Sequence, residues 1–150
     1  HSWSWGKYDG TDTNTSGASN QQTPKRMYDV LPELENEKIV DVHCGYGWYG
    51  DGHILMLTAS GKVYGWGQNN YGQLGDGSTT NKSAPASVTG ISNAVDVAAG
   101  EDHTCAVIND GTVKCWGINN SGQLGDGTTT SSNLPVSVLI SITLVGVFLS

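Results

Sequence analysis

Histidine is the residue type in this chain best suited to binding a transition metal. A free amino-terminal residue, His1, could chelate copper through its amine and its ring, and His43, His53 or His103 could supply a second imidazole. His53 and His103 lie 50 residues apart in matching stretches of sequence, which favours a structural role for both. A copper site built on His1 is therefore only an alternative, and we expect no metal and no other cofactor.

A short aromatic segment, residues 46–52, could bind a sugar. Tyr46, Trp48 and Tyr49 offer flat faces that stack on sugar rings, and the carboxylate of Asp51 can accept hydrogen bonds from sugar hydroxyls. The matching stretch 50 residues later lacks this segment, so the segment is not needed to build the fold. The alternative is a loop that packs on its own rings or lies at a subunit contact.

Two glycine-rich segments, residues 72–77 and 122–127, resemble a phosphate-binding loop only superficially. Both lack the Lys-Ser/Thr pair of a P-loop and a following helix. We interpret them as tight turns in which glycine adopts a positive φ, while Leu74 or Leu124 anchors the turn in the core. We find no nucleophile–base set and no pair of carboxylates that is not explained by the structural repeat. We therefore expect that the chain is not an enzyme.

The charge of the chain argues against nucleic acid as a partner. Fourteen acidic and seven basic residues give a net charge of −7, the wrong sign for holding phosphates. The longest apolar run, residues 138–149, is interrupted by polar residues. It is also shorter than the roughly 18 residues of a membrane-spanning helix, so we expect no membrane span.

Several features favour an extracellular protein. The chain begins with His1 rather than Met, which suggests processing. Three sequons for N-glycosylation occur, at Asn14, Asn81 and Asn119. Any one of them could arise by chance in Asn- and Thr-rich sequence. Together with the processed start they predict a secreted glycoprotein.

The chain repeats itself with a period of 50 residues. Residues 61–88 match residues 111–138 at 17 of 28 positions. A degenerate earlier copy begins at Trp5 and Gly6 and carries insertions. Repeats of this length are units of a few strands or helices that stack side by side and bury a common core.

Within the repeat, the pattern indicates short strands at residues 94–99, 103–108 and 112–116. The segment Asn-Asp-Gly before residue 112 is a strong hairpin signal. With Gly111 in a left-handed conformation, facing residue numbers sum to 220, which places Cys105 opposite Cys115. Facing β-carbons lie about 4.5–5.5 Å apart, slightly wide for a relaxed disulfide. We predict a disulfide here; two free buried thiols are the alternative, and Cys44 has no assigned partner.

The long motif from His103 to Thr128 resembles the repeats of the regulator of chromosome condensation family. It reads His-Thr-Cys-Ala-Val, then Asp-Gly-Thr-Val-Lys-Cys-Trp-Gly, then Gly-Gln-Leu-Gly-Asp-Gly-Thr. The resemblance implies a β-propeller, usually of about seven blades with four strands and roughly 50 residues each. Members serve as exchange factors or interaction platforms, so the resemblance alone decides little about function.

We therefore predict an all-β, propeller-type array of about three four-stranded units of ~50 residues, too short for a closed seven-bladed ring. The expected parts are residues 1–38, a degenerate first repeat with insertions and a Ser/Thr/Asn-rich loop; residues 39–88 and 89–138, two repeats; and residues 139–150, an apolar terminal strand.

An open array exposes unpaired strand edges and apolar faces at its ends. We expect the terminal strand to add to another copy, which would give a ring or a filament. The candidate contacts are Val145, Val147 and Phe148 on one copy and Trp3 and Trp5 on the other. The favoured function is thus a self-assembling extracellular structural protein. The alternatives are a protein- or glycan-binding propeller module and a fragment of a longer propeller protein.

Overall fold

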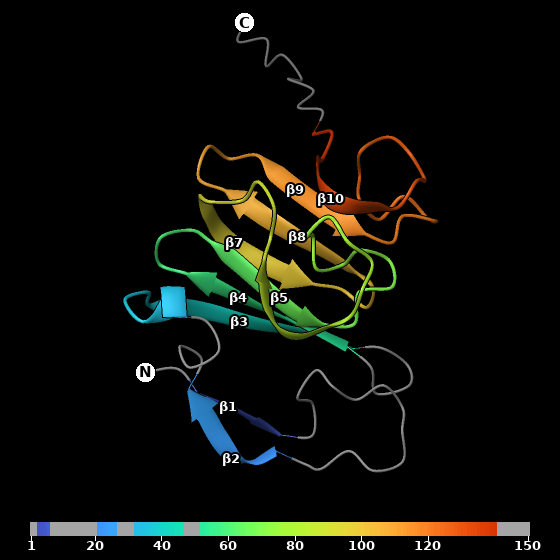
Figure 1. Cartoon of the computed structure of the whole chain (residues 1–150). Helices are drawn as coiled ribbons and strands as arrows, with labels where there is room; N and C mark the ends of the chain where they lie inside the picture. Colours follow the sequence, from blue (N-terminus) through green and yellow to red (C-terminus); the bar gives the residue numbers. More distant parts are fainter. Residues whose placement is uncertain (1–2, 7–20, 27–31, 47–51, 141–150) are drawn as a thin grey trace, which may run out of the picture.

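The computed structural model describes residues 3–6, 21–26, 32–46 and 52–140. These residues form two four-stranded antiparallel sheets, one two-stranded sheet and a short 3-10 helix, η1 (Pro32–Leu34) (Figure 1). The described part is all-β, and each larger sheet has the four strands predicted for a propeller blade. The sheets form no closed ring within these ranges, in agreement with the predicted partial propeller.

The first four-stranded sheet runs up and down through consecutive strands. Its strands are β3 (Ile39–Tyr46), β4 (Gly52–Thr58), β5 (Val63–Gly67) and β6 (Lys82–Ser87). They pair in the order β3-β4-β5-β6, so each hairpin connects neighbours in the sheet. The glycine-rich loop between β5 and β6 covers residues 68–81 and leaves the sheet towards the next one (Figure 1).

The second four-stranded sheet has the same plan. Its strands are β7 (Ala94–Ala99), β8 (His103–Ile108), β9 (Val113–Gly117) and β10 (Ser132–Ser137), in the order β10-β9-β8-β7. β7 lies beside β3 and β4 of the first sheet. The two sheets therefore stand next to each other as neighbouring blades do, with β3 and β7 on the same side.

The two-stranded sheet pairs β1 (Trp3–Gly6) with β2 (Gln21–Arg26), and Trp3 lies opposite Arg26. Of the predicted terminal strand, only Leu139 and Ile140 fall within the described residues, and they belong to no strand. Residues 141–150 lie outside the described part of the chain.

A buried apolar cluster joins the two four-stranded sheets. Leu57 and Val63 of the first sheet pack with Ala106, Ile108 and Trp116 of the second. A second cluster lies on the opposite face of the first sheet and contains Leu34, Met56, Tyr64 and Trp66. The first sheet contributes to both clusters because successive side chains of a strand point to opposite faces of a sheet.

The β8–β9 hairpin has the predicted register. Gly111 adopts a φ of 86°, and Cys105 lies directly opposite Cys115. The two cysteines form a disulfide, with Cα atoms 4.1 Å apart. The corresponding pair in the first sheet is Leu55 and Gly65, so the disulfide is not required by the fold. Cys44 is a free, exposed thiol.

Candidate protein-interaction surface

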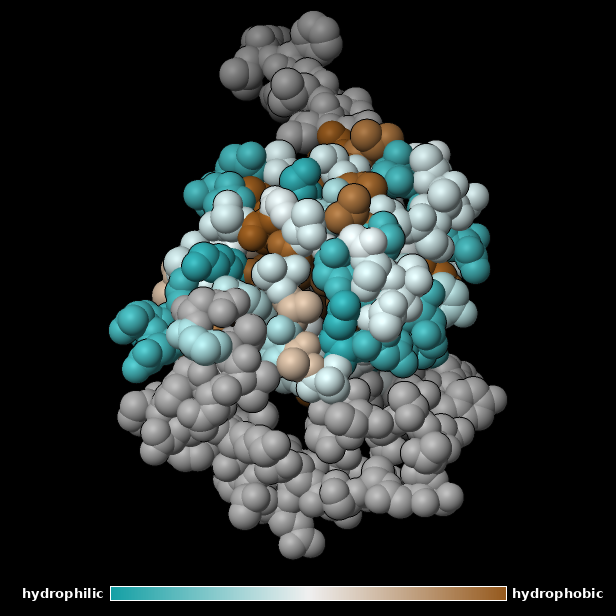
Figure 2. Space-filling model, in the orientation of Figure 1, coloured by the Kyte–Doolittle hydropathy of each residue, from teal (hydrophilic) through white to brown (hydrophobic). Residues whose placement is uncertain are grey.

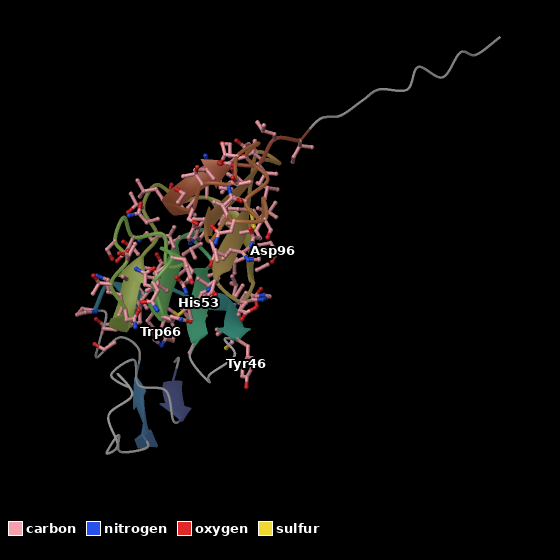
Figure 3. All side chains as sticks on the ribbon, turned by 90° about the vertical axis from the view of Figure 1, so that its right-hand side faces the viewer. Tyr46, His53, Trp66 and Asp96 are labelled. Atoms are coloured by element: carbon pink, nitrogen blue, oxygen red, sulfur yellow. A yellow bond between two sulfur atoms is a disulfide. The ribbon has the colours of Figure 1, made fainter. Side chains whose placement is uncertain are left out.

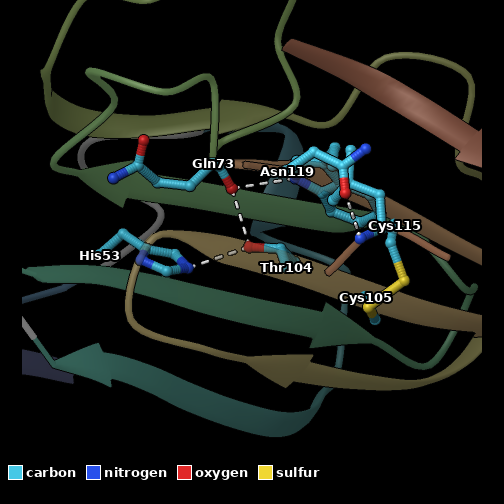
Figure 4. Close-up of a disulfide and its surroundings, with 8 residues drawn as sticks. His53, Gln73, Thr104, Cys105, Cys115 and Asn119 are labelled. Atoms are coloured by element: carbon cyan, nitrogen blue, oxygen red, sulfur yellow. Dashed lines mark hydrogen bonds between the residues drawn. A yellow bond between two sulfur atoms is a disulfide. The ribbon is translucent and has the colours of Figure 1, made fainter. Parts of the chain in front are cut away.

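The two four-stranded sheets are joined by a buried chain of hydrogen bonds, which we call the seam (Figure 4). His53 on β4 lies 2.9 Å from Thr104 on β8, measured from Nε2 to Oγ1. The Thr104 hydroxyl donates its single proton to the backbone carbonyl of Gln73, at 2.8 Å. Thr104 must therefore accept from His53, so Nε2 of His53 carries the ring proton.

Gln73, from the loop between β5 and β6, is the centre of the seam. Its carbonyl also accepts a hydrogen bond from the indole Nε1 of Trp116, at 2.9 Å. Its side-chain amide donates to the carboxylate of Asp102, at 3.1 Å. One residue of the first sheet's loop thus binds three side chains of the second sheet, and its own side chain is fully buried.

A buried asparagine fixes the loop that carries Gln73. The Asn69 side chain accepts a hydrogen bond from the Leu74 backbone and donates to the carbonyls of Ser78 and Thr80. Leu74 is fully buried, as the sequence predicts for an anchor. Asp76 accepts from the Ser78 backbone at 2.9 Å, so it stabilises the turn.

Glycine allows the loop to approach the indole of Trp116. Gly75 has a φ of 67°, and a β-carbon there would lie 2.7 Å from Nε1 of Trp116. A larger residue would therefore separate the two sheets at this point. The positive φ of Gly75 confirms the predicted tight turn, and the structure adds that this turn lies in the contact between the two sheets.

Burial controls the ionisation of the seam. Desolvation lowers the pKa of His53 from 6.5 to about 4, and the nearby His103 disfavours a second positive charge. The Nδ1 atom of His53 is buried and has no hydrogen-bond partner among the described residues. Burial, followed by the charge of Glu101, raises the pKa of Asp102. The seam therefore contains a neutral imidazole at neutral pH.

The second sheet repeats the seam's contact residues on its far side, on a surface that we call the open face. It is formed by His103, Cys105, Val107, Val113, Gln123 and Val138, the repeat equivalents of His53, Leu55, Leu57, Val63, Gln73 and Val88. All six residues of the first sheet are buried, whereas all six of the open face are partly exposed. The disulfide to Cys115 crosses the middle of this face.

The structure separates the predicted sugar-binding residues from the core tryptophans. Tyr46 is 79 % exposed at the end of β3 and points away from the sheets (Figure 3). Trp48, Tyr49 and Asp51 lie outside the described residues. Trp66 and Trp116 are buried, as repeat-equivalent core residues should be.

One predicted glycosylation site is wrong. Asn119 is fully buried, and its side-chain amide donates to the carbonyls of Thr128 and Thr130, so it has no room for a glycan. It performs the same loop-fixing role as Asn69. Asn81 is exposed, and its side-chain oxygen accepts from the Asn69 backbone. Asn14 lies outside the described residues.

A histidine outside the seam and the open face, His43, belongs to a separate group of possible metal ligands on β3 and β7. His43 on β3 lies 3.0 Å from Asp41, and Asp96 on β7 completes a set whose ligand atoms lie within 4.8 Å of one another. The sequence did not suggest this group, although the motif Val-Asp-Val occurs on both strands. The side chains of Asp41 and His43 are both well exposed, and such groups are common without a metal. His1 lies outside the described residues.

The predicted assembly contacts are Trp3, Trp5, Val145, Val147 and Phe148, and their side chains lie outside the described part of the chain. The last described residues are apolar and exposed: Leu139 is 68 % and Ile140 58 % accessible. Figure 2 shows hydrophobic surface at this end of the molecule. Within the described ranges no helix has the length and apolar character needed to cross a membrane.

Sequence reasoning missed the two residues that hold the seam together, Gln73 and Thr104. Gln73 acts through its backbone carbonyl, which a sequence pattern does not reveal. One sequence feature could have indicated the role of Gln73. Both repeats have glutamine at this position of the glycine-rich turn, as Gln73 and Gln123.

Comparison with known proteins places the repeats in a family. The model of the regulator of chromosome condensation (RCC1) repeat matches residues 60–107 and 110–147, and a second model of the same description matches residues 94–123. The human E3 ubiquitin-protein ligase HERC2 is 35 % identical over 106 residues, which are 69 % of this chain and 2 % of HERC2.

Solved structures show the same fold. Human WBSCR16 superposes with a TM-score of 0.67 and 28 % identity, over 90 % of this chain and 33 % of that protein. Yeast RCC1 (Prp20), solved bound to Kap60, superposes with a TM-score of 0.70 over 95 % of this chain and 32 % of that one, and at 23 % identity it shows the fold alone. The chain thus spans about a third of these structures and a far smaller part of HERC2.

Proposed function

The chain belongs to the family of regulator of chromosome condensation (RCC1) repeats, and from this premise we propose that it is a propeller-type module for protein interaction. The observation that carries the proposal is the open face. Six residues that are buried between the two sheets in one repeat are partly exposed in the next. A partner that covers the open face would bury the same kinds of side chain that the seam already buries.

The open face is suited to a protein rather than a small ligand. It combines apolar residues, Val107, Val113 and Val138, with the polar groups of His103 and Gln123. Interfaces combine an apolar centre with a few directed hydrogen bonds in this way.

Site-specific photo-crosslinking tests the proposal. A photoreactive amino acid at position 107, on the open face, should trap a partner protein, whereas the same group at the exposed Val95 on β7 should not. Val95 is the matched control because it is also a strand valine, on β7, and is not one of the six residues of the open face. Adducts at neither position, or equally at both, would contradict the proposal.

Self-assembly in an extracellular setting is the second candidate function. The exposed Leu139 and Ile140 favour it, because exposed apolar ends associate. The disulfide Cys105–Cys115 agrees with an oxidising compartment. Deleting residues 139–150 should then convert oligomers into soluble monomers, as measured by size-exclusion chromatography with light scattering. An unchanged mass would rule this function out.

A further inference from the structure

We propose that Asp41, His43 and Asp96 bind a divalent transition metal ion, and that zinc is the ion they fit. The three residues come from β3 and β7, the first strands of the two four-stranded sheets, which lie side by side. The site is separate from the proposed interaction surface, because none of the three belongs to the open face. Figure 3 shows Asp96 at the edge of the sheets, away from the seam residue His53.

The chain holds the two carboxylates in the same way. Oδ1 of Asp41 accepts a hydrogen bond from the Val42 backbone at 2.8 Å, and Oδ1 of Asp96 accepts one from the Val97 backbone at 2.9 Å. The strand pairing shifts register just before each aspartate, and such a shift changes the direction of a side chain. Each aspartate thus binds its own strand through one oxygen, which leaves its second oxygen available for a ligand.

The histidine is not needed to build the repeat. Residues 40–45 and 95–100 share the pattern Val-Asp-Val-x-x-Gly, in which Asp41 is equivalent to Asp96 but His43 is equivalent to Ala98. The second sheet therefore forms the same strand with alanine at this position. Carboxylates alone suit magnesium or calcium, which take oxygen ligands. An imidazole beside two carboxylates changes the preference to zinc and similar ions.

The distances fit an ion after a small movement of one side chain. The ligand atoms all lie within 4.8 Å of one another. In a tetrahedral zinc site, with bonds of about 2.0–2.1 Å, neighbouring ligand atoms lie about 3.3 Å apart. Nε2 of His43 and Oδ2 of Asp41 are already 3.0 Å apart, so the exposed Asp96 side chain makes the approach. Zinc takes the place of the proton between Nε2 and Oδ2, and Nδ1 of the neutral ring carries the proton instead.

The charge of the group favours a cation as its ligand. Among the described residues, no lysine or arginine forms an ion pair with Asp41 or Asp96. The imidazole of His43 can supply at most one positive charge against the two carboxylates, whereas a divalent ion balances both. The side chains of Asp41 and His43 are each 40 % exposed, so an ion can reach them from solvent.

An ion held by these three side chains joins the two sheets at a second place, in addition to the seam. Because Asp41 and His43 lie far from Asp96 in sequence, only the folded chain brings the three ligands together. Zinc should therefore stabilise the folded chain, as any ligand specific to the folded state does. In a tetrahedral site the three side chains leave one position, which water can fill.

Isothermal titration calorimetry with the full chain tests the site. The chain is stripped of metal with a chelator and titrated with zinc chloride, and we expect saturable binding of one ion. H43Q and D96N should each weaken binding by more than about tenfold, since losing even a residue that supports a ligand costs that much. Both variants should fold, because glutamine can still donate to Asp41 and the asparagine oxygen can still accept from the Val97 backbone.

Two control variants separate the site from other ways of attracting a metal ion. D110N neutralises an exposed aspartate in the β8–β9 turn, and H1Q removes the amino-terminal histidine. Both should bind zinc like the parent. Zinc should raise the midpoint of thermal unfolding of the parent and of both controls, but not that of H43Q.

Several results would overturn the site. These are the absence of saturable zinc binding, equal binding by H43Q and the parent, and loss of binding in H1Q or D110N. Titration in an excess of magnesium gives one further check, because magnesium should not displace zinc from a site that contains an imidazole. Displacement by magnesium would show a general attraction of cations to carboxylates and would also refute the proposal.

Discussion

The imidazole of His53 and the hydroxyl of Thr104, 51 residues apart in sequence, form a hydrogen bond of 2.9 Å that joins two sheets. The proton order is fixed, because Thr104 donates onward to the Gln73 carbonyl. The Thr104 hydroxyl of the second sheet thus connects the His53 side chain to the backbone carbonyl of Gln73.

Replacing Thr104 by Val should destabilise the protein. The Nε2–H of His53 would remain buried without a partner, and the Gln73 carbonyl would keep only the hydrogen bond from Trp116, so we expect the free energy of unfolding to fall by about 2–3 kcal/mol. Urea denaturation followed by tryptophan fluorescence measures this change. T89V is the control, since Thr89 is exposed, and it should stay within about 0.5 kcal/mol of the parent. Equal effects of the two variants would refute the role of the hydroxyl.

Acid should weaken the protein through His53. Its pKa is about 4 when folded and 6.5 as the reference value, so between these pH values the unfolded chain binds a proton that the folded chain does not. The contribution to stability is complete above pH 6.5. It falls by about 1 kcal/mol per pH unit on acidification and levels off near pH 4.

Denaturation at a series of pH values tests this dependence. H53Q should flatten the profile between pH 6.5 and 4, because glutamine can donate to Thr104 but does not titrate. A slope that survives in H53Q would assign the effect to other groups.

Much of the fold was predictable because it is local. The period of 50 residues predicted the length of each repeat. The turn at Gly111 predicted the strand register that places Cys105 opposite Cys115. The seam was not predictable, because Gln73 contributes a backbone carbonyl and Thr104 meets it only after two sheets pack. Asn119 was mispredicted for the same reason. Its sequon suggested an exposed side chain, whereas in the fold its buried amide donates a hydrogen bond to the Thr128 carbonyl of the same loop.

The buried loop asparagine Asn69 should contribute far more to the free energy of unfolding than its neighbour Asn70. Asn69 is fully buried and satisfies three backbone groups, so N69A should lower the free energy of unfolding by about 3 kcal/mol. Asn70 is exposed, and N70A should change it by less than about 0.5 kcal/mol. Thermal unfolding of the N69A and N70A variants measures both changes in stability. A small effect of N69A would mean that other contacts hold the loop.

Reducing the disulfide should cost stability without unfolding the first sheet. The bridged cysteines are 10 residues apart, and closing a loop of this size stabilises by about 2–3 kcal/mol. Denaturation with and without reductant measures the difference. C44S should leave it unchanged, because Cys44 is a free thiol. An equal loss in C44S would point to a different pairing in solution.

The disulfide between Cys105 and Cys115 also changes how the chain would respond to mechanical force. When the chain is pulled from its two ends, tension passes through the sulfur atoms, so the hairpin between the cysteines bears no load. An extended residue spans about 3.5 Å, so the oxidised chain should stretch about 30 Å less than the reduced one on full unfolding. The β8–β9 hairpin would thus stay closed while the rest of the chain is drawn out.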